Sequence, residues 1–203
     1  MKQSKTMITS KPHLLWTFLA MVVLSFTTTA QESTWTIDPS HSAINFDIPY
    51  FKVGTIKGVF DRYTGSFTEE NERITALNIT IETASVNTNQ KDRDKHLRSD
   101  DFFSAEVHPE IHFKSTGIEN TGDGTYTITG DFTMTGITKS IVLKGVDKGS
   151  FIHPRFKTTN KFITVTGQIN RDDFKVGANY APAKMALGSE VGLIAEIHLI
   201  QDK

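Results

Sequence analysis

Strict alternation of apolar and polar side chains is the feature of this sequence that most narrows its fold. Two segments, 75–82 and 126–134, alternate with a period of two over eight residues or more. Their apolar members are Leu77, Ile79, Ile81, Tyr126, Ile128, Phe132 and Met134. Because successive side chains of a strand point to opposite faces, both segments predict β-strands with one buried face. We expect these apolar residues to point into the interior and to line a ligand cavity there.

Further segments have the same period or are rich in β-branched and aromatic residues. The candidate strands are 35–38, 42–48, 59–67, 111–118, 141–146, 162–169 and 191–199. Turn residues separate several of them, as in Asn120–Gly124 and Asp147–Gly149. With 27 Thr, 19 Ile and 14 Phe, the composition also favours strands. About eight or nine strands at hairpin spacing predict an all-β antiparallel barrel or sandwich in a single domain.

Two stretches interrupt the strand pattern. Residues 87–105 are polar and charged, and Asp92, Asp94 and Ser99 are candidate helix caps. In 179–187, Pro182 is suited to open a short helix. The sequence therefore predicts one or two short helices that partly cover the mouth of a barrel.

The first thirty residues read as a secretory signal peptide. Lysines precede a 13-residue apolar run at 14–26. The small residues Thr28, Thr29 and Ala30 follow this run and form a candidate cleavage site. As a helix this run is about 20 Å long, short of a hydrocarbon core of about 30 Å. We therefore expect cleavage after Ala30, a mature domain at 31–203, no membrane span after cleavage and a periplasmic location.

Charge and cysteine content exclude several functions. A net charge of −1 gives little attraction to a polyphosphate backbone, which makes nucleic acid an unexpected partner. The absence of Cys excludes disulfides, thiolate metal sites and cysteine nucleophiles. An exported protein without Cys fits a bacterial periplasm, where folding need not depend on cross-links.

The remaining candidates for chemistry do not form recognisable motifs. On a strand, His108 and His112 share a face but lie about 13 Å apart, too far for one metal ion. The serines considered as nucleophiles, at 40, 42, 99 and 140, lack a G-x-S-x-G context. The adjacent pairs Asp100-Asp101 and Asp172-Asp173 are typical of surfaces and caps. We expect no catalytic residue, no metal and no cofactor.

Aromatic and cationic residues leave alternatives open. Phe46, Phe60 and Phe113, with the apolar faces above, either line a ligand cavity or fill a core, since eight strands enclose only side chains or one small ligand. Arg93 and Arg171 each precede an acid. They serve either as local ion pairs that fix loops or as cationic contacts for an anionic lipid head group.

Six ordered blocks, spread over about residues 34–200, resemble the YceI-like family of periplasmic lipid-binding proteins. They are Trp35-x-Ile37-Asp38-x-x-His41-Ser42-x-Ile44-x-Phe46, Gly58-Val59-Phe60, Arg93-Asp94-x-His96-Leu97-x-Ser99-x-Asp101-Phe102-Phe103, Pro109-x-Ile111-x-Phe113-x-Ser115, Gly130-Asp131-Phe132-Thr133-Met134-x-Gly136-Ile137-Thr138-Lys139 and Arg171-x-Asp173-Phe174. One departure is Lys175, where the family has Gly.

The resemblance implies an eight-stranded antiparallel, lipocalin-like barrel that holds a long isoprenoid, either a polyprenyl chain or a quinone tail. It implies no metal and no catalysis. We therefore expect non-enzymatic binding, storage or transport of such a lipid. The rival interpretations are a secreted hydrolase on the same barrel and a packed-core stress-response module. The identity of the lipid and the formation of a homodimer stay open.

Overall fold

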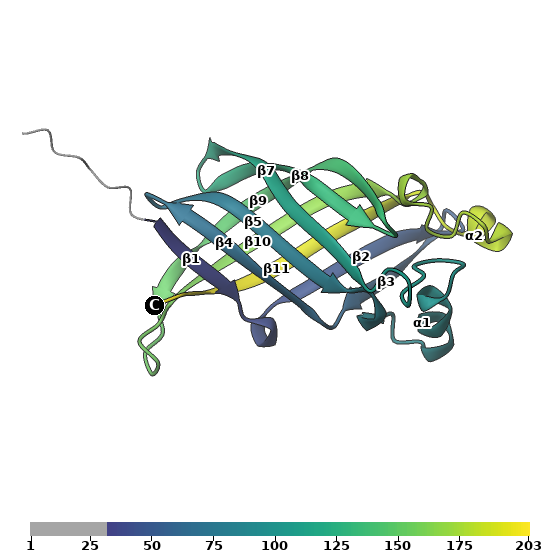
Figure 1. Cartoon of the computed structure of the whole chain (residues 1–203), viewed down its shortest axis with the longest axis horizontal. Coiled ribbons are helices and arrows are strands. Elements are labelled where there is room, and N and C mark those ends of the chain that lie inside the picture. Colours follow the sequence, from purple (N-terminus) through teal and green to yellow (C-terminus); the bar gives the residue numbers. More distant parts are fainter. Residues whose placement is uncertain (1–31) are drawn as a thin grey trace, which may run out of the picture.

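The computed structural model describes residues 32–203 (Figure 1). The predicted signal peptide, 1–30, lies outside the described residues. Within 32–203 the chain forms eleven strands, two α-helices and three short 3₁₀-helices. The strands are β1 (Glu32–Ile37), β2 (Ala43–Tyr50), β3 (Gly54–Phe60), β4 (Tyr63–Glu70), β5 (Arg73–Glu82), β6 (Val86–Asn87), β7 (Glu110–Gly122), β8 (Thr125–Met134), β9 (Ile137–Ile152), β10 (Thr159–Asn170) and β11 (Glu190–Gln201). The helices are α1 (Lys91–Arg98), α2 (Ala181–Ala186), η1 (Pro39–His41), η2 (Thr83–Ser85) and η3 (Arg171–Phe174).

The sheet closes on itself as an antiparallel barrel. The pairing order β1-β4-β5-β7-β8-β9-β10-β11 returns to β1, where Trp35 lies opposite Gln201. The remaining strands, β2, β3 and β6, extend three of these eight. β2 continues β1 along β11, β3 continues β4 along β2, and β6 continues β5 along β3. The predicted eight-stranded antiparallel barrel is therefore confirmed.

Each of these three extended strands bends at a corner between its two halves. η1 separates β1 from β2, residues 61–62 separate β3 from β4, and η2 separates β5 from β6. The last two corners bond to each other: Asp61 N donates to Ser85 O and Glu82 N donates to Arg62 O. The sequence predicted a single strand over 59–67, which is wrong. β3 ends at Phe60 because the backbone of residues 61 and 62 bonds to the neighbouring corner rather than continuing along a strand.

Both α-helices lie beyond the same end of the barrel (Figure 1). α1 begins after Gln90, whose side-chain oxygen accepts from Arg93 N at 2.5 Å, and it ends at the cap residue Ser99. Asp92 and Asp94 occupy the first turn instead of the cap, where negative charge favours the helix N-terminus. α2 has Pro182 in its first turn, as predicted. No helix within residues 32–203 has the length and apolar character needed to cross a bilayer.

The end of the barrel away from the helices is filled by side chains, and we call it the packed end. Its buried residues include Trp35, Phe67, Ile74, Tyr126, Ile128 and Leu199. It also encloses an ion pair between Lys161 and Glu69, with Asp147 Oδ2 3.5 Å from Lys161 Nζ. The ammonium group of Lys161 lies 5.1 Å from the ring centre of Trp35, a cation–π contact. The charge of Lys161 is thus compensated on several sides.

Candidate functional site

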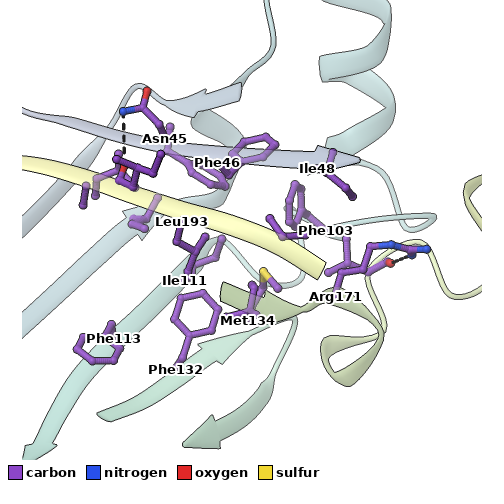
Figure 2. Close-up of a pocket in the computed structure, with 18 of the residues that line it drawn as sticks. Asn45, Phe46, Ile48, Phe103, Ile111, Phe113, Phe132, Met134, Arg171 and Leu193 are labelled. Carbon is purple, nitrogen blue, oxygen red and sulfur yellow. Dashed lines mark hydrogen bonds between the residues drawn. The ribbon is translucent and has the colours of Figure 1, made fainter. Parts of the chain in front are cut away.

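Between the packed end and the helices, the barrel encloses a cavity of about 200 Å³ (Figure 2). Its wall is formed by the inward faces of the strands, and α1 with the segments around α2 borders its mouth. Nearly all of the lining is apolar. The polar residues that contribute are Asn45, Thr88, Arg93, His96, Thr166 and Arg171. Such a site favours an apolar ligand with any polar group at the mouth.

Eight of the ten apolar residues predicted from the sequence to line a cavity do line it. They are Phe46, Phe60, Leu77, Ile79, Ile81, Phe113, Phe132 and Met134. Tyr126 and Ile128 point inward as expected, but they are buried among the side chains of the packed end. The reason is that β8 is longer than the cavity, so its first residues lie beyond the open space. Across the sheet, Tyr126 lies opposite Gly145 of β9 and Ile128 lies opposite Leu143.

Two glycines give room for aromatic rings that lie across the wall. A Cβ atom on Gly58 would lie 2.3 Å from Phe46 Cζ, and one on Gly130 would lie 2.4 Å from Phe113 Cζ. Each ring therefore covers a neighbouring strand instead of filling the centre of the barrel. The Phe46 ring also contacts Phe60, with ring centres 5.6 Å apart. This arrangement keeps the interior open while the wall remains apolar.

An aromatic cluster covers part of the mouth. The His96 ring of α1 packs edge-on against Phe102 at 5.0 Å and against Tyr180 at 4.8 Å. His96 Nε2 also lies 2.8 Å from Asp101 Oδ2. Phe103 contacts Phe60 in the barrel wall, with ring centres 6.0 Å apart. The cluster joins α1 to the segment before α2, which agrees with the predicted partial cover.

Arg93 lies at the mouth and bonds to the loop before α1. Its Nε donates to Thr88 Oγ1 at 2.7 Å, and its Nη2 donates to the Thr88 carbonyl at 2.8 Å. The buried carboxylate of Asp94 accepts from Thr88 N at 2.8 Å and from Thr88 Oγ1. Thr88 thus joins Arg93 and Asp94, and this network fixes α1 over the cavity.

Arg171 is only 4 % exposed and also borders the cavity. Its Nε donates to Gly188 O at 2.9 Å and its Nη1 donates to Val176 O at 2.7 Å. Asp172 Oδ1 lies 3.3 Å from Nη1. Arg171 therefore forms the local ion pair of the first alternative, whereas Arg93 holds its loop through hydrogen bonds to Thr88 and not through an ion pair with Asp94. Both arginines also contribute to the cavity lining, as the second alternative requires.

The serines and carboxylates considered as candidates for hydrolysis do not line the cavity. Within residues 32–203, its lining contains no Ser, Asp or Glu. Ser42 Oγ donates to Asp38 O, and Ser99 Oγ donates to His96 O. His112 lies on the exterior, with its Nε2 3.2 Å from Glu110 Oε2.

A closed meander barrel around an apolar cavity, with helices at one end, defines a class of ligand-enclosing β-barrels of lipocalin type. The family model for the YceI-like domain matches residues 35–199. The chain belongs to the YceI-like family, as the motifs indicated.

Two relatives agree with this assignment. Protein YceI of Escherichia coli is 35 % identical over 165 residues, which cover 80 % of this chain and 83 % of that protein. UPF0312 protein plu2095 of Photorhabdus laumondii is 34 % identical over 169 residues, which cover 82 % of this chain and 85 % of that protein.

Solved structures show the same fold. The Campylobacter jejuni YceI protein superposes with a TM-score of 0.68 at 27 % identity, covering 74 % of this chain and 88 % of that chain. Burkholderia cenocepacia BcnA gives a TM-score of 0.72 at 18 % identity, covering 80 % and 98 %. A domain from Saccharophagus degradans, described as polyisoprenoid binding, gives 0.61 at 14 % identity, covering 83 % and 98 %.

Proposed function

We propose that this protein is a non-enzymatic binding protein that stores or carries an isoprenoid-type lipid, a polyprenyl chain or a quinone, in the periplasm. The observation that carries the proposal is the apolar cavity inside a closed barrel. The description of the Saccharophagus degradans domain supports the ligand class. The signal-like segment at 1–30 supports export.

Burial of the lipid tail supplies the binding free energy. Each buried CH₂ group contributes about 0.8 kcal/mol before the cost of ordering the chain. Micromolar affinity corresponds to about 8 kcal/mol, so about ten buried CH₂ groups, two isoprene units, supply the gross amount. Longer chains offset the ordering cost. The aromatic rings of Phe46, Phe113 and Phe132 add contact area for the methyl branches.

A polar head group would lie at the mouth, where the cationic side chains gather. Arg93 and Arg171 line that end, and His96 lies beside them on α1. Positive charge in a largely apolar site favours an anionic or hydrogen-bond-accepting head group. The lipid would therefore enter tail first, with its tail directed toward the packed end.

Native mass spectrometry of the protein purified without detergent tests this function. We expect a bound mass in the range of an isoprenoid lipid. Ile79→Trp fills the cavity and should remove the lipid. Asn78→Trp places the same ring on the exposed outer face of β5 and should leave the lipid in place. A protein without any bound lipid, or an Ile79→Trp variant with unchanged lipid content, would contradict the proposal and favour a packed-core module.

A further inference from the structure

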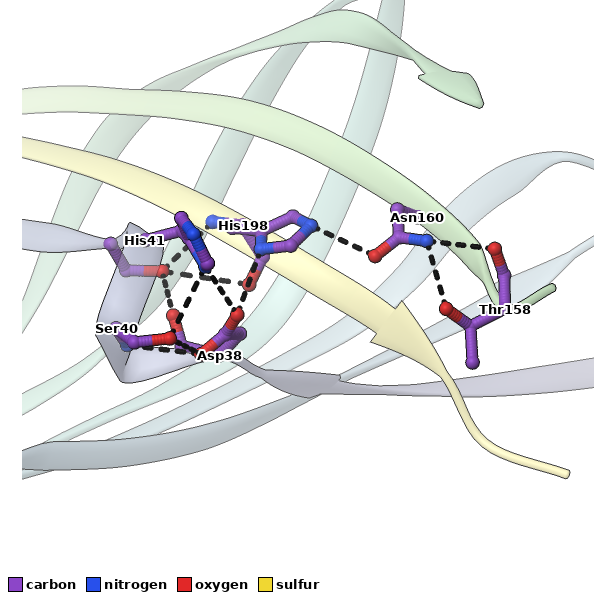
Figure 3. A network of polar contacts seen from close by, with 7 residues as sticks. Asp38, Ser40, His41, Thr158, Asn160 and His198 are labelled. Carbon is purple, nitrogen blue, oxygen red and sulfur yellow. Dashed lines mark hydrogen bonds and ion pairs between the residues drawn. The ribbon is translucent and has the colours of Figure 1, made fainter. Parts of the chain in front are cut away.

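A second cluster of chemically versatile side chains lies outside the cavity, at the corner between β1 and β2. Asp38, His41 and His198 each offer one ligand atom there, and these atoms all lie within 4.8 Å of one another (Figure 3). His41 Nδ1 lies 2.7 Å from Asp38 Oδ2, and His198 Nδ1 lies 3.1 Å from the same oxygen. Neither the barrel cavity nor its mouth includes these residues.

Hydrogen bonds and ring stacking that do not involve the ligand atoms hold Asp38 and His198 in place. Asp38 N donates to His198 O at 2.9 Å, which ties the start of η1 to β11. Ser42 Oγ donates to Asp38 O at 2.7 Å and accepts from His198 N at 2.9 Å. The ring of His198 stacks on Phe162, with ring centres 4.6 Å apart. The cluster is therefore a built feature of the fold and not a chance meeting of mobile side chains.

The hydrogen bond to Asn160 determines which ring nitrogen of His198 carries a hydrogen and which is left as a metal ligand. The Asn160 amide nitrogen donates to the Thr158 carbonyl at 2.7 Å, so the amide oxygen must face His198. That oxygen lies 2.9 Å from His198 Nε2 and can only accept, so Nε2 carries a hydrogen. Metal-binding histidines are typically oriented in this way, with the second ring nitrogen donating to a fixed oxygen. Nδ1 of His198 is then available toward Asp38 and His41.

We propose that Asp38, His41 and His198 bind one divalent transition-metal ion such as Zn²⁺. Two imidazoles and one carboxylate suit Zn²⁺ better than Mg²⁺ or Ca²⁺, which prefer oxygen ligands alone. Ligand atoms at about 2.1 Å in a tetrahedron lie about 3.4 Å apart. The pairs at 2.7 and 3.1 Å need only a small opening. The His41 side chain is 66 % exposed, which leaves the fourth position open to water.

A metal at this point would join the first corner of the barrel to its last strand. β1 and β11 pair over only three residues, Trp35–Ile37 against Leu199–Gln201, where the barrel closes. We call this pairing of β1 with β11 the seam. The ion would add a second connection, between η1 and β11, beside it. Because it binds the folded arrangement, it should stabilise the closed barrel by an amount that grows with the logarithm of its concentration over Kd.

The test is a calorimetric Zn²⁺ titration of the full-length protein, without a histidine tag and after EDTA treatment. We expect one equivalent of Zn²⁺ and a higher melting temperature in its presence. His41→Gln should weaken binding at least tenfold, and it should not disturb folding because the side chain is exposed. His112→Gln is the matched control, since His112 pairs with one carboxylate, Glu110, and it should bind Zn²⁺ as the parent does.

The rival arrangement places a second hydrogen on the His198 ring, so that Asp38 accepts from both histidines and no ion binds. Absence of a stoichiometric Zn²⁺ site, or uptake that His41→Gln leaves unchanged, overturns the proposal. Lipid content measured in the same His41→Gln protein should stay unchanged, because the cluster lies outside the cavity. Failure of this site and failure of the lipid site are therefore distinguishable.

Discussion

Two buried isoleucines, Ile79 and Ile128, have different surroundings inside the same barrel. Ile79 lines the cavity, whereas Ile128 is 1 % exposed and packs beyond it. We expect Ile128→Ala to cost about 2–5 kcal/mol in lipid-free protein, because the surrounding side chains leave a new void. Ile79→Ala should cost less, since its side chain already borders open space. Urea unfolding of both lipid-free variants measures the difference, and equal costs would show that the cavity is collapsed in solution.

The ion pair between Lys161 and Glu69 makes stability sensitive to alkaline pH. Burial lowers the pKa of Lys161, but its hydrogen bond and charge interaction with Glu69, aided by Asp147, raise it above the usual 10.5 overall. Because the folded protein holds this proton more tightly, the contribution is complete below about pH 10.5 and is lost as pH rises through the folded pKa. We expect the free energy of unfolding to fall in that range.

The control for this prediction removes both charges. Burial also raises the pKa of Tyr126, which adds a slope of the same sign. The double variant Lys161→Met with Glu69→Leu should therefore retain part of the pH dependence and lose the part due to the pair. Lys161→Met alone leaves Glu69 buried without its partner and should cost about 3–5 kcal/mol. Identical pH profiles for the parent and the double variant would refute the assignment.

At the scale of elements, a buried carboxylate helps to hold α1 over the cavity. Asp94 accepts two hydrogen bonds from Thr88, which also binds Arg93. Asp94→Ala leaves Thr88 N without its partner and should loosen α1 from β6. We expect faster lipid release with little change in the strands, measured as lipid transfer to vesicles. Asp92→Ala, on the exposed side of the same turn, is the control and should transfer lipid at the parent rate.

The sequence predicted the elements whose signals are local. Period-two alternation identified most strands, and the polar stretch 87–105 and Pro182 located both helices, although Asp92 and Asp94 were wrong as caps. The corner at Asp61–Arg62 was missed because its hydrogen bonds go to residues 82 and 85, which no local pattern reveals. The inward direction of Ile128 was predictable from alternation, but its depth along the barrel depends on the register of β8 against β9.

Sequence distance also explains the missed cluster of Asp38, His41 and His198. Asp38-x-x-His41 forms part of a recognised motif, yet His198 is 160 residues from Asp38 and its spacing carries no signal. The sequence-based expectation of no metal rested on local His and carboxylate spacing, the absence of Cys and the family resemblance, none of which reports on residues brought together from the two ends of the domain. The burial of Arg171 could not be predicted from the sequence either. Its acceptors, the carbonyls of Val176 and Gly188, become its neighbours only through the fold of η3 and the loop around α2.

At the scale of the whole molecule, the barrel consists of a packed end, a cavity and a covered mouth, which have different structural roles. Side chains fill the packed end, the apolar cavity occupies the interior, and α1 and α2 cover its mouth. The three corners bend three neighbouring strands between their two halves, so one continuous sheet forms the wall of both regions. A single closed sheet therefore combines a rigid base with an interior that has room for a ligand.

The seam between β1 and β11 has a consequence for the order of folding. Its pairs join residues near the two ends of the described chain, and the bond from Thr36 to Asp202 spans 166 positions. Every other neighbouring strand pair in the ring is joined by a much shorter connection. Closing a longer loop costs more chain entropy before any contact compensates it, so we expect the seam to form late in folding. Until it forms, β1 and β11 present unpaired edges to other chains, so a newly synthesised molecule is most prone to aggregation just before its barrel closes.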